Sequence, residues 1–207
     1  MPIRILIADD HPLLREGVAA VLELRDDMEL VGEAVDGHDA VEKFRSLRPD
    51  VALMDIQMPG MDGIAAIAAI RAFQADARII VLTTYKGDVQ ALRALKAGAS
   101  GYLLKHMLRR DLLETIVAVH GGRRYIPAEI AGQIAEHTVD DALSPREIEI
   151  LRLVADGNAN RHVATRLGIT EETVKAHMKS ILAKLGARDR THATTIALRR
   201  GFIDLPE

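Results

Sequence analysis

Short apolar segments alternate with amphipathic segments along the first 120 residues of the chain. Four of the five apolar segments carry almost no polar side chains. Strands that are covered on both faces have this composition, because neither face meets water. The pattern therefore predicts buried parallel strands over residues 3–8, 28–34, 51–55, 78–83 and 101–105.

The segments between these strands have apolar residues at spacings of three and four, which is the period of an amphipathic helix. We expect helices that begin at Pro12 and that cover residues 38–47, 62–74, 88–97 and 108–120. Strand–helix repeats joined by right-handed crossovers form a doubly wound parallel sheet. This part of the chain is therefore predicted to be an α/β domain with a five-stranded parallel sheet.

Residues 143–207 have a different pattern, which consists of short helical segments. Ser144, Pro145 and Glu147 occupy the N-cap, first and third positions of a helix, which is the signature of a capping box. The tight turn at Gly168 favours a helix-turn-helix, although a plain four-helix bundle has the same spacing. The further helices of this part are expected over residues 160–167, 170–185 and 189–200.

The two patterns divide the chain into a domain of residues 1–120, a connector of residues 121–142 with space for one short helix, and an all-α domain of residues 143–207. The sequence VDDA at the end of the connector indicates a flexible joint. Residues 1–142 carry 16 Lys and Arg against 22 Asp and Glu, a net charge of −6. Residues 143–207 carry 11 against 8, a net charge of +3, so the two parts are expected to have different partners.

The composition of the 207 residues excludes several classes of protein. There is no Cys, so disulfides and thiolate metal sites are not expected. No apolar run approaches the ~18 residues that a membrane span needs, and no export signal is visible at the N-terminus. Aromatic residues are only 3% of the chain, which argues against stacking platforms for single-stranded nucleic acid. We therefore expect a cytoplasmic protein with no membrane partner.

Five polar residues stand at the C-terminal ends of the predicted strands, namely Asp9, Asp10, Asp55, Thr83 and Lys105. In a sheet of order 2-1-3-4-5, these ends meet where the strand order reverses, which is where open parallel sheets bind ligands. Three converging carboxylates repel one another, and a hard cation such as Mg²⁺ relieves the repulsion. A carboxylate beside a metal, a hydroxyl and an ammonium group can accept a phosphoryl group. Each residue alone has an ordinary structural explanation, but five on one edge favour this functional interpretation.

Four motifs in the α/β domain resemble those of the receiver domain of bacterial two-component response regulators, which has a flavodoxin-like fold. They are ADDH (8–11), MDIQMPGMDG (54–63), LTTY (82–85) and KAGASGYLLK (96–105). The resemblance implies that Asp55 is the phospho-acceptor. It also implies that Asp10, Asp55 and the backbone carbonyl of Gln57 bind Mg²⁺ directly, with Asp9 acting through water. Gln57 and Tyr85 correspond to positions that tune the loss of phosphate, and a bulky Tyr85 is expected to slow that loss.

By the same resemblance, Thr83 and Lys105 hold the phosphoryl oxygens. Tyr102 matches an aromatic switch residue, which turns inward when Thr83 moves toward the phosphate. The chain departs from the family at His106, because many receivers have Pro there, after a cis peptide bond. A cis bond before a residue other than Pro costs about 3 kcal/mol, so the departure leaves the local backbone geometry open.

The predicted helix over residues 170–185 has two distinct faces. Its apolar residues recur at spacings of three and four and are expected to face the core: Val174, Met178, Ile181 and Leu185. Another face carries Lys175, Ala176 and Lys179, and a short polar stripe of this kind can enter the major groove of DNA. A solvated surface is the alternative explanation for the two lysines.

Residues 143–193 resemble the LuxR-type helix-turn-helix of the NarL/FixJ group of regulators, most specifically in TVKAHMKSILAKL. The resemblance implies that Lys175, Ala176 and Lys179 read bases. The phosphate contacts that it suggests are Thr170, Thr173, Asn160, Arg161 and Arg188. Such modules bind paired half-sites as dimers. The dimer contacts that the resemblance suggests are Thr194, Ala197 and Leu198.

The combined prediction is a phosphorylation-activated transcription regulator, not an enzyme. It receives a phosphoryl group from a sensor histidine kinase and binds double-stranded promoter DNA as a homodimer. A hydrolase of the haloacid dehalogenase type is a rival interpretation, but its second Asp would stand two positions after Asp55, where this chain has Gln57. An RNA-binding antiterminator is a second rival, but its output domain lacks the capping box and the TVKAHMKS helix.

Overall fold

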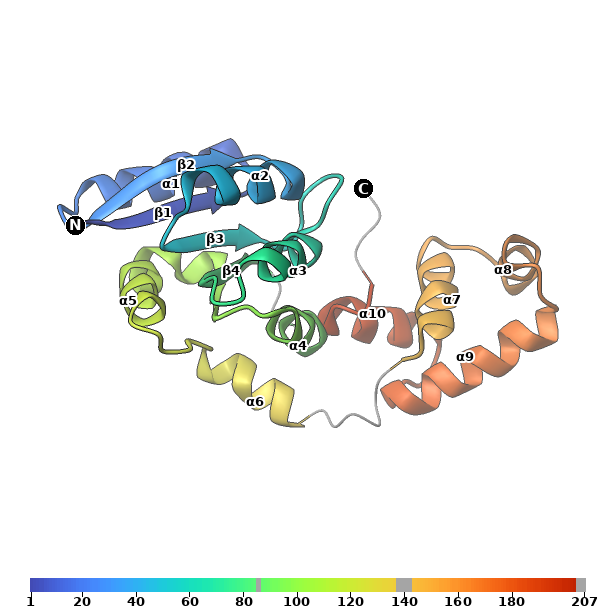
Figure 1. Cartoon of the computed structure of the whole chain (residues 1–207). Helices are drawn as coiled ribbons and strands as arrows, with labels where there is room; N and C mark the ends of the chain where they lie inside the picture. The colour runs from blue at the N-terminus through green and yellow to red at the C-terminus, as the bar shows by residue number, and fades with distance from the viewer. Residues whose placement is uncertain (85–86, 137–142, 204–207) are drawn as a thin grey trace. The chain divides into compact units, whose positions relative to one another are not determined.

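A computed structural model describes residues 1–84, 87–136 and 143–203, and Figure 1 shows the course of the chain. Contacts divide the chain into two compact units. The first contains Met1–Tyr85 and Ala91–Ala131, and the second contains Gly132–Glu207 together with Lys86–Gln90. Two predicted features, the tuning residue Tyr85 and the joint at residues 139–142, lie outside the described residues.

A five-stranded parallel sheet in the order β2-β1-β3-β4-β5 forms the centre of the first unit (Figure 1). Its strands are β1 (Ile3–Ala8), β2 (Met28–Ala34), β3 (Val51–Asp55), β4 (Ile79–Thr83) and β5 (Gly101–Leu104). The order and the parallel pairing confirm the predicted doubly wound fold. Every residue of β3 and β4 is buried, as expected for strands that have helices on both faces.

Helices pack on both faces of this sheet. The helices before the connector are α1 (Pro12–Glu23), α2 (Gly37–Leu47), α3 (Gly63–Phe73), α4 (Asp88–Ala97) and α5 (Leu108–His120). α1 and α5 share one apolar core with the strands, to which they contribute Val18, Leu22, Leu112, Ile116 and Val119. α2 packs against α3, β1 and β2. The apolar faces predicted from the helical spacing are therefore the faces that bury the sheet.

The loop after β3 is held close to the end of that strand. It turns at Gly60, whose φ of 72° lies in the left-handed region that Gly adopts without strain. A Cβ atom at Gly63 would overlap the backbone carbonyl of Asp55, so no larger residue fits there. Asp62 caps α3 by accepting a hydrogen bond of 2.7 Å from the backbone N–H of Ala65. These contacts explain the Pro-Gly and Asp-Gly pairs that follow Asp55 in the sequence.

The connector contains one short helix, α6 (Ala128–Glu136), as predicted. Four helices follow it: α7 (Pro145–Ala155), α8 (Asn160–Leu167), α9 (Glu171–Leu185) and α10 (Arg190–Arg200). α8 ends at Gly168, whose φ is 63°, and α9 begins after the N-cap residue Thr170. The short turn between α8 and α9 confirms a helix-turn-helix within the second unit.

The predicted capping box at the start of α7 is present. The hydroxyl of Ser144 accepts a hydrogen bond from the backbone N–H of Glu147, and the Glu147 carboxylate accepts one from the backbone N–H of Ser144. The same carboxylate accepts hydrogen bonds of 2.7 Å from Ser180 Oγ and Lys184 Nζ. Glu147 therefore joins α7 to α9, which the sequence pattern did not predict.

The backbone at His106 is regular. No peptide bond among the described residues is cis, so the Lys105–His106 bond is trans. Lys105 opens a short 3₁₀ turn, η1 (Lys105–Met107), which leads directly into α5.

Candidate functional site

The register of the sheet gathers the predicted polar residues at one edge. Asp9 follows the β1 residue that is paired with Met54, so it lies beside Asp55. On the other side of Asp55, Thr83 is the last residue of β4 and Lys105 is the first residue after β5. The last residue of the apolar strand β3, Asp55, therefore lies at a polar edge of the sheet that several strands share.

Lys105 joins the two buried carboxylates of this edge. Its Nζ donates a hydrogen bond of 2.8 Å to Oδ2 of Asp55 and lies 2.8 Å from Oδ2 of Asp9. Asp9 and Asp55 are 0% and 3% exposed. The ion pairs are therefore shielded from water. Electrostatic interactions are stronger in such a buried environment than at the protein surface.

Burial is the main influence on the acidity of Asp55. It raises the pKa of this carboxyl from 3.8 to about 6, although the hydrogen bond and charge of Lys105 lower it and the charge of Asp9 raises it. Burial lowers the pKa of Lys105, but its interactions with Asp55 and Asp9 outweigh this effect and raise the pKa overall. Lys105 is therefore a fixed positive charge beside a carboxylate that is ionised near neutral pH.

The cluster is suited to a divalent cation. One ligand atom from each of Asp9, Asp10, His11 and Asp55 lies within 4.8 Å of the others. The edge holds three carboxyl groups against the one ammonium group of Lys105, so it has an excess of acidic side chains that a divalent cation can balance. His11 was not predicted from the sequence, although its position directly after two acidic residues was a usable signal.

The predicted switch residue Tyr102 is fully buried on β5. Burial raises the pKa of its phenol, and a side-chain hydrogen bond with Thr83 lowers it by less. Tyr102 is therefore already inward and in contact with Thr83 in this structure, and its role as a switch stays a prediction.

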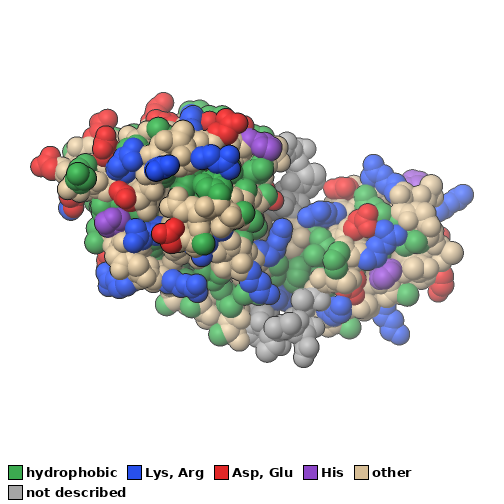
Figure 2. All heavy atoms as spheres, viewed as in Figure 1, with side chains coloured by type: hydrophobic (Ala, Val, Ile, Leu, Met, Phe, Trp, Pro, Cys, Tyr) green, Lys and Arg blue, Asp and Glu red, His purple; other side chains and the backbone are tan. Residues whose placement is uncertain are grey.

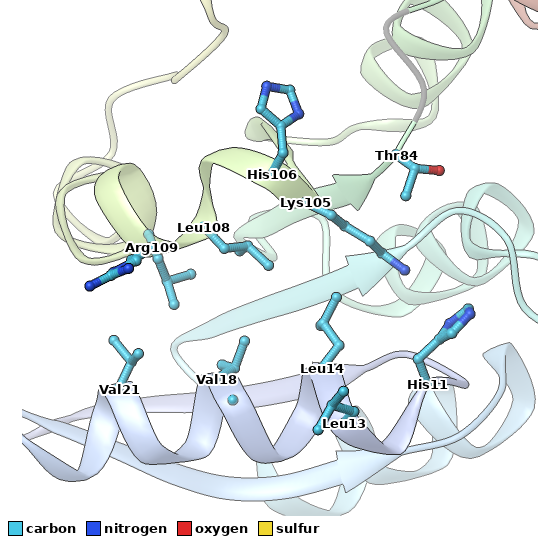
Figure 3. A pocket seen from close by; sticks show the side chains of 12 residues that line it. His11, Leu13, Leu14, Val18, Val21, Thr84, Lys105, His106, Leu108 and Arg109 are labelled. Carbon is cyan, nitrogen blue, oxygen red and sulfur yellow. The ribbon is translucent and has the colours of Figure 1, made fainter.

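An apolar groove of about 570 Å³ opens beside the acidic cluster. Figure 3 shows it between α1 and the segment formed by η1 and the start of α5. Its apolar lining includes Leu13, Leu14, Val18, Val21, Leu108 and Leu112. Leu13 is 82% exposed, and His11 and Lys105 also line the groove. An approaching partner can therefore cover apolar surface and reach the cluster at the same time.

The helix α9 has the two faces that the sequence predicts. Val174, Met178, Ile181 and Leu185 are buried in the core of the second unit. Lys175, Ala176 and Lys179 are exposed. Figure 2 shows Lys and Arg side chains interspersed with acidic ones over the part of the surface that α8 and α9 form. The second helix of the helix-turn-helix therefore presents a polar face with two lysines to solvent.

Comparison with known families identifies both parts of the chain. Residues 5–117 match the response regulator receiver domain, and residues 141–197 match the bacterial regulatory proteins of the luxR family. The chain belongs to the response-regulator family. It combines a receiver domain with a luxR-type DNA-binding domain, which is the composition of a transcriptional response regulator.

Known response regulators align with this chain over most or all of their length. The chain is 40% identical to the transcriptional regulatory protein LiaR of Bacillus subtilis, with 98% of this chain and 100% of LiaR aligned. It is 38% identical to the nitrate/nitrite response regulator protein NarL of Escherichia coli K12, over 93% of each chain. RcsB, solved as dimers bound to DNA, has a TM-score of 0.70 and 28% identity, with 96% of this chain and 99% of that chain covered.

The remaining predicted DNA contacts of the response regulator lie at the start of α9, at the start of α8 and just after the end of α9. Thr170 caps α9 by accepting a hydrogen bond from the backbone N–H of Thr173. Arg161 and Arg188 are exposed, and Asn160 is half-buried at the start of α8. The structure is consistent with phosphate contacts at these positions, which stay predictions.

One predicted dimer contact is wrong in this structure. Ala197 of α10 is 0% exposed, because it faces the core of the second unit together with Ala193, four residues earlier on the same face. Thr194 and Leu198 are half-buried and stay predictions.

Among the described residues, no helix is long and apolar enough to cross a membrane.

Proposed function

We propose that phosphorylation of Asp55 switches this response regulator toward dimeric binding of promoter DNA. The observation that carries the proposal is the position of Lys105, whose ammonium group lies 2.8 Å from the carboxylates of both Asp9 and Asp55. An acceptor carboxylate beside a fixed positive charge is the arrangement that phosphoryl transfer requires. The receiver and luxR-type matches support the coupling of this site to DNA.

The proposed donor is the phosphohistidine of a sensor histidine kinase. A carboxylate oxygen of Asp55 forms a bond to phosphorus while the bond from phosphorus to the donor's imidazole nitrogen breaks. Lys105 and Thr83 donate to the phosphoryl oxygens and stabilise their charge. The kinase docks over the groove between α1 and α5, where Leu13 is exposed beside the acidic cluster.

The acidic cluster at the end of β1 and β3 would hold a divalent cation, and its carboxylate oxygens are donors that Mg²⁺ accepts. Asp10, Asp55 and the backbone carbonyl of Gln57 are the direct ligands in this proposal, and Asp9 acts through water. When bound, the cation supplies positive charge that offsets the charge of the phosphoryl oxygens.

The response passes from Asp55 to the surface through Thr83 and Tyr102. When Thr83 turns toward the phosphoryl group, it favours the inward position of Tyr102, and the face around β5 changes its preferred contacts. Phosphorylation thus shifts an existing equilibrium toward a form that dimerises, with Thr194 and Leu198 as proposed contacts of α10. The functional division is a receiver of residues 1–120, a linker of residues 121–142 and a DNA-binding domain of residues 143–207, acting in the cytoplasm.

Footprinting on the gene's own upstream DNA tests the proposed function. We expect protection of paired half-sites when acetyl phosphate and Mg²⁺ are present, and much weaker protection without acetyl phosphate. Duplex RNA of the same sequence should not compete. Turnover of a chromogenic phosphomonoester, or equal binding to RNA, would contradict the proposal.

Replacement of Lys179 by Ala is expected to relax base preference at the specific site at a cost of about 1–3 kcal/mol of binding free energy. The reason is that the exposed ammonium group on α9 can donate to guanine O6 and N7. Binding to specific and scrambled duplexes at several salt concentrations measures the effect. Arg188→Ala is the comparison, because a lost phosphate contact should weaken binding to all sequences alike. Equal weakening in the Lys179 variant would reassign that residue to the phosphate backbone.

A further inference from the structure

Two acidic residues, Glu171 and Glu172, stand in the first turn of α9. Acidic side chains are common at this place, because they interact favourably with the positive end of the helix dipole. The two side chains differ in exposure, which is 48% for Glu171 and 85% for Glu172. The dipole accounts for both residues alike, so it does not account for this difference.

The geometry of the helix gives the reason for the difference. Successive residues of an α-helix are turned by about 100° around its axis. Measured from the mean direction of the buried residues of α9, Glu171 lies at about 50° and Glu172 at about 150°. The buried residues that define this direction are Val174, Met178, Ile181 and Leu185. Glu171 therefore borders the core, and Glu172 points away from it.

Glu172 lies in the middle of the face that carries the predicted base readers. Ala176 lies at about 170° and Lys179 at about 130° from the buried direction, so Glu172 falls between them. Lys175, at about 90°, is nearer the side of the helix. In a helix-turn-helix, the first residues of the second helix contact base edges in the major groove. A carboxylate at this position therefore faces the bases when its neighbours reach them.

The ion pair with Lys175 does not hold the Glu172 carboxylate elsewhere. Oε2 of Glu172 lies 3.5 Å from Nζ of Lys175, which exceeds the usual hydrogen-bond length of about 2.7–3.2 Å. The same ammonium group lies 3.6 Å from Oε1 of Glu171. Exposed pairs of this kind contribute little free energy, so Glu172 can exchange Lys175 for a closer donor.

The edges of the bases restrict which of them can supply that donor. The phosphates repel a carboxylate, so it gains only from a hydrogen-bond donor on a base. In the major groove, guanine presents only the acceptors N7 and O6, and thymine presents the acceptor O4. Adenine sets its N6 amino group beside the acceptor N7, whereas cytosine presents the N4 amino group alone. Cytosine is therefore the base that best matches a carboxylate.

We propose that Glu172 is a specificity-determining residue that accepts a hydrogen bond from the N4 amino group of a cytosine in each half-site. The inference rests on the proposed function, because it requires α9 to enter the major groove. It adds an acidic reader to the predicted lysines and assigns it a base. The competing interpretation is that Glu172 only stabilises the first turn of α9, as Glu171 does.

Selection of bound duplexes from a randomised DNA library decides between these interpretations, with the full-length protein, acetyl phosphate and Mg²⁺. Glu172→Gln is expected to lower the preference for cytosine at one position of the half-site about tenfold. Adenine should rise at that position, because an amide can pair with both N6 and N7 of adenine. Glu171→Gln is the matched control, because it removes the same charge from the same turn and should leave the selected sequence unchanged.

An unchanged base preference in Glu172→Gln overturns the inference, even where affinity for all duplexes changes equally. A change at a position where the unmodified protein does not select cytosine also overturns it. Enrichment of no duplex sequence by the unmodified protein would instead contradict the proposed function itself, and the inference would fall with it.

Fluorescence anisotropy with two duplexes that differ only at the selected pair gives a second measurement. The unmodified protein and Glu171→Gln are expected to bind the duplex with C·G about tenfold more tightly than the duplex with T·A. For Glu172→Gln, the ratio should fall below about twofold. A ratio that stays near tenfold in Glu172→Gln would contradict the assignment of cytosine to this residue.

Discussion

Replacement of Asp55 by Asn is expected to abolish phosphoryl incorporation from acetyl phosphate in the presence of Mg²⁺. The amide that replaces the carboxylate keeps the size of the side chain but is a far weaker nucleophile. Intact-mass measurement and a phosphate-affinity gel report the modification directly. Asp76→Asn is the control, because Asp76 is an exposed carboxylate of the same unit and its loss should leave incorporation unchanged.

The same substitution has a second expected effect, on the stability of the metal-free receiver. The folded protein raises the pKa of Asp55 from 3.8 to about 6, mainly through burial, so the folded form holds this proton more tightly than the unfolded chain. The stability that the protonated Asp55 carboxyl contributes is fully present below pH 3.8 and is lost as the pH rises through about 6. At pH 7 and without metal, Asp55→Asn should therefore be more stable by up to about 3 kcal/mol.

Urea unfolding in the presence of EDTA, monitored by hydrogen exchange in β1 and β3, measures the difference in unfolding free energy between the variant and the unmodified protein. This difference should become smaller as the pH is lowered toward 4. A phosphoryl group on the Asp55→Asn protein that hydroxylamine removes would falsify the acceptor assignment and point to Asp9 or Asp10. Unchanged stability at pH 7 would instead mean that Lys105 compensates the buried charge fully. The two results are independent, so each can fail alone.

The sheet and most helix boundaries could be predicted because their signals are local. β3 is predicted by a continuous apolar run, and α7 by Ser144, Pro145 and Glu147 at fixed positions. The meeting of Asp9, Asp55 and Lys105 followed from strand order, because parallel strands end on one edge of the sheet. These features need only short-range patterns and one topological rule.

The features that the sequence missed depend on side-chain direction and on long-range packing. His11 was treated as part of a motif, and only coordinates show its ring turned toward Asp10. Ala197 was assigned to a dimer surface by resemblance, although its helical face is buried in the core. Such errors arise because a period of 3.6 residues defines faces of a helix but does not say what covers each face.

Glu147 is the clearest case of a residue whose sequence signal showed only part of its role. The capping box explains one of the hydrogen bonds that its carboxylate accepts, and the other two come from Ser180 and Lys184 on α9. The carboxylate is buried, at 3% exposure, and these donors satisfy it. Because α9 carries the proposed base-reading residues, Glu147 helps to fix the orientation of the recognition helix.

Replacement of Glu147 by Ala is therefore expected to destabilise the second unit by roughly 3 kcal/mol. The Ala variant removes the acceptor of all three hydrogen bonds, and the half-buried donors Ser180 and Lys184 lose a partner inside the second unit. Glu149→Ala is the matched control, because Glu149 is an exposed acid two residues later that pairs with Arg146 at the surface. Surface pairs of this kind contribute ~1 kcal/mol or less. Hydrogen exchange of the α7 and α9 amides measures both variants.

The stability that Glu147 contributes also has a defined pH dependence. Burial raises the pKa of this carboxyl, but Lys184, the backbone N–H of Ser144 and Ser180 together lower it from 4.5 to about 2. A lowered pKa means that the contribution is complete above pH 4.5 and decreases as the pH falls from 4.5 toward 2. The difference between the unmodified protein and Glu147→Ala should therefore narrow over that interval. A stability difference that stays constant down to pH 2 would show that Glu147→Ala acts through lost packing. Equal losses of stability in Glu147→Ala and Glu149→Ala would contradict the proposed link between α7 and α9.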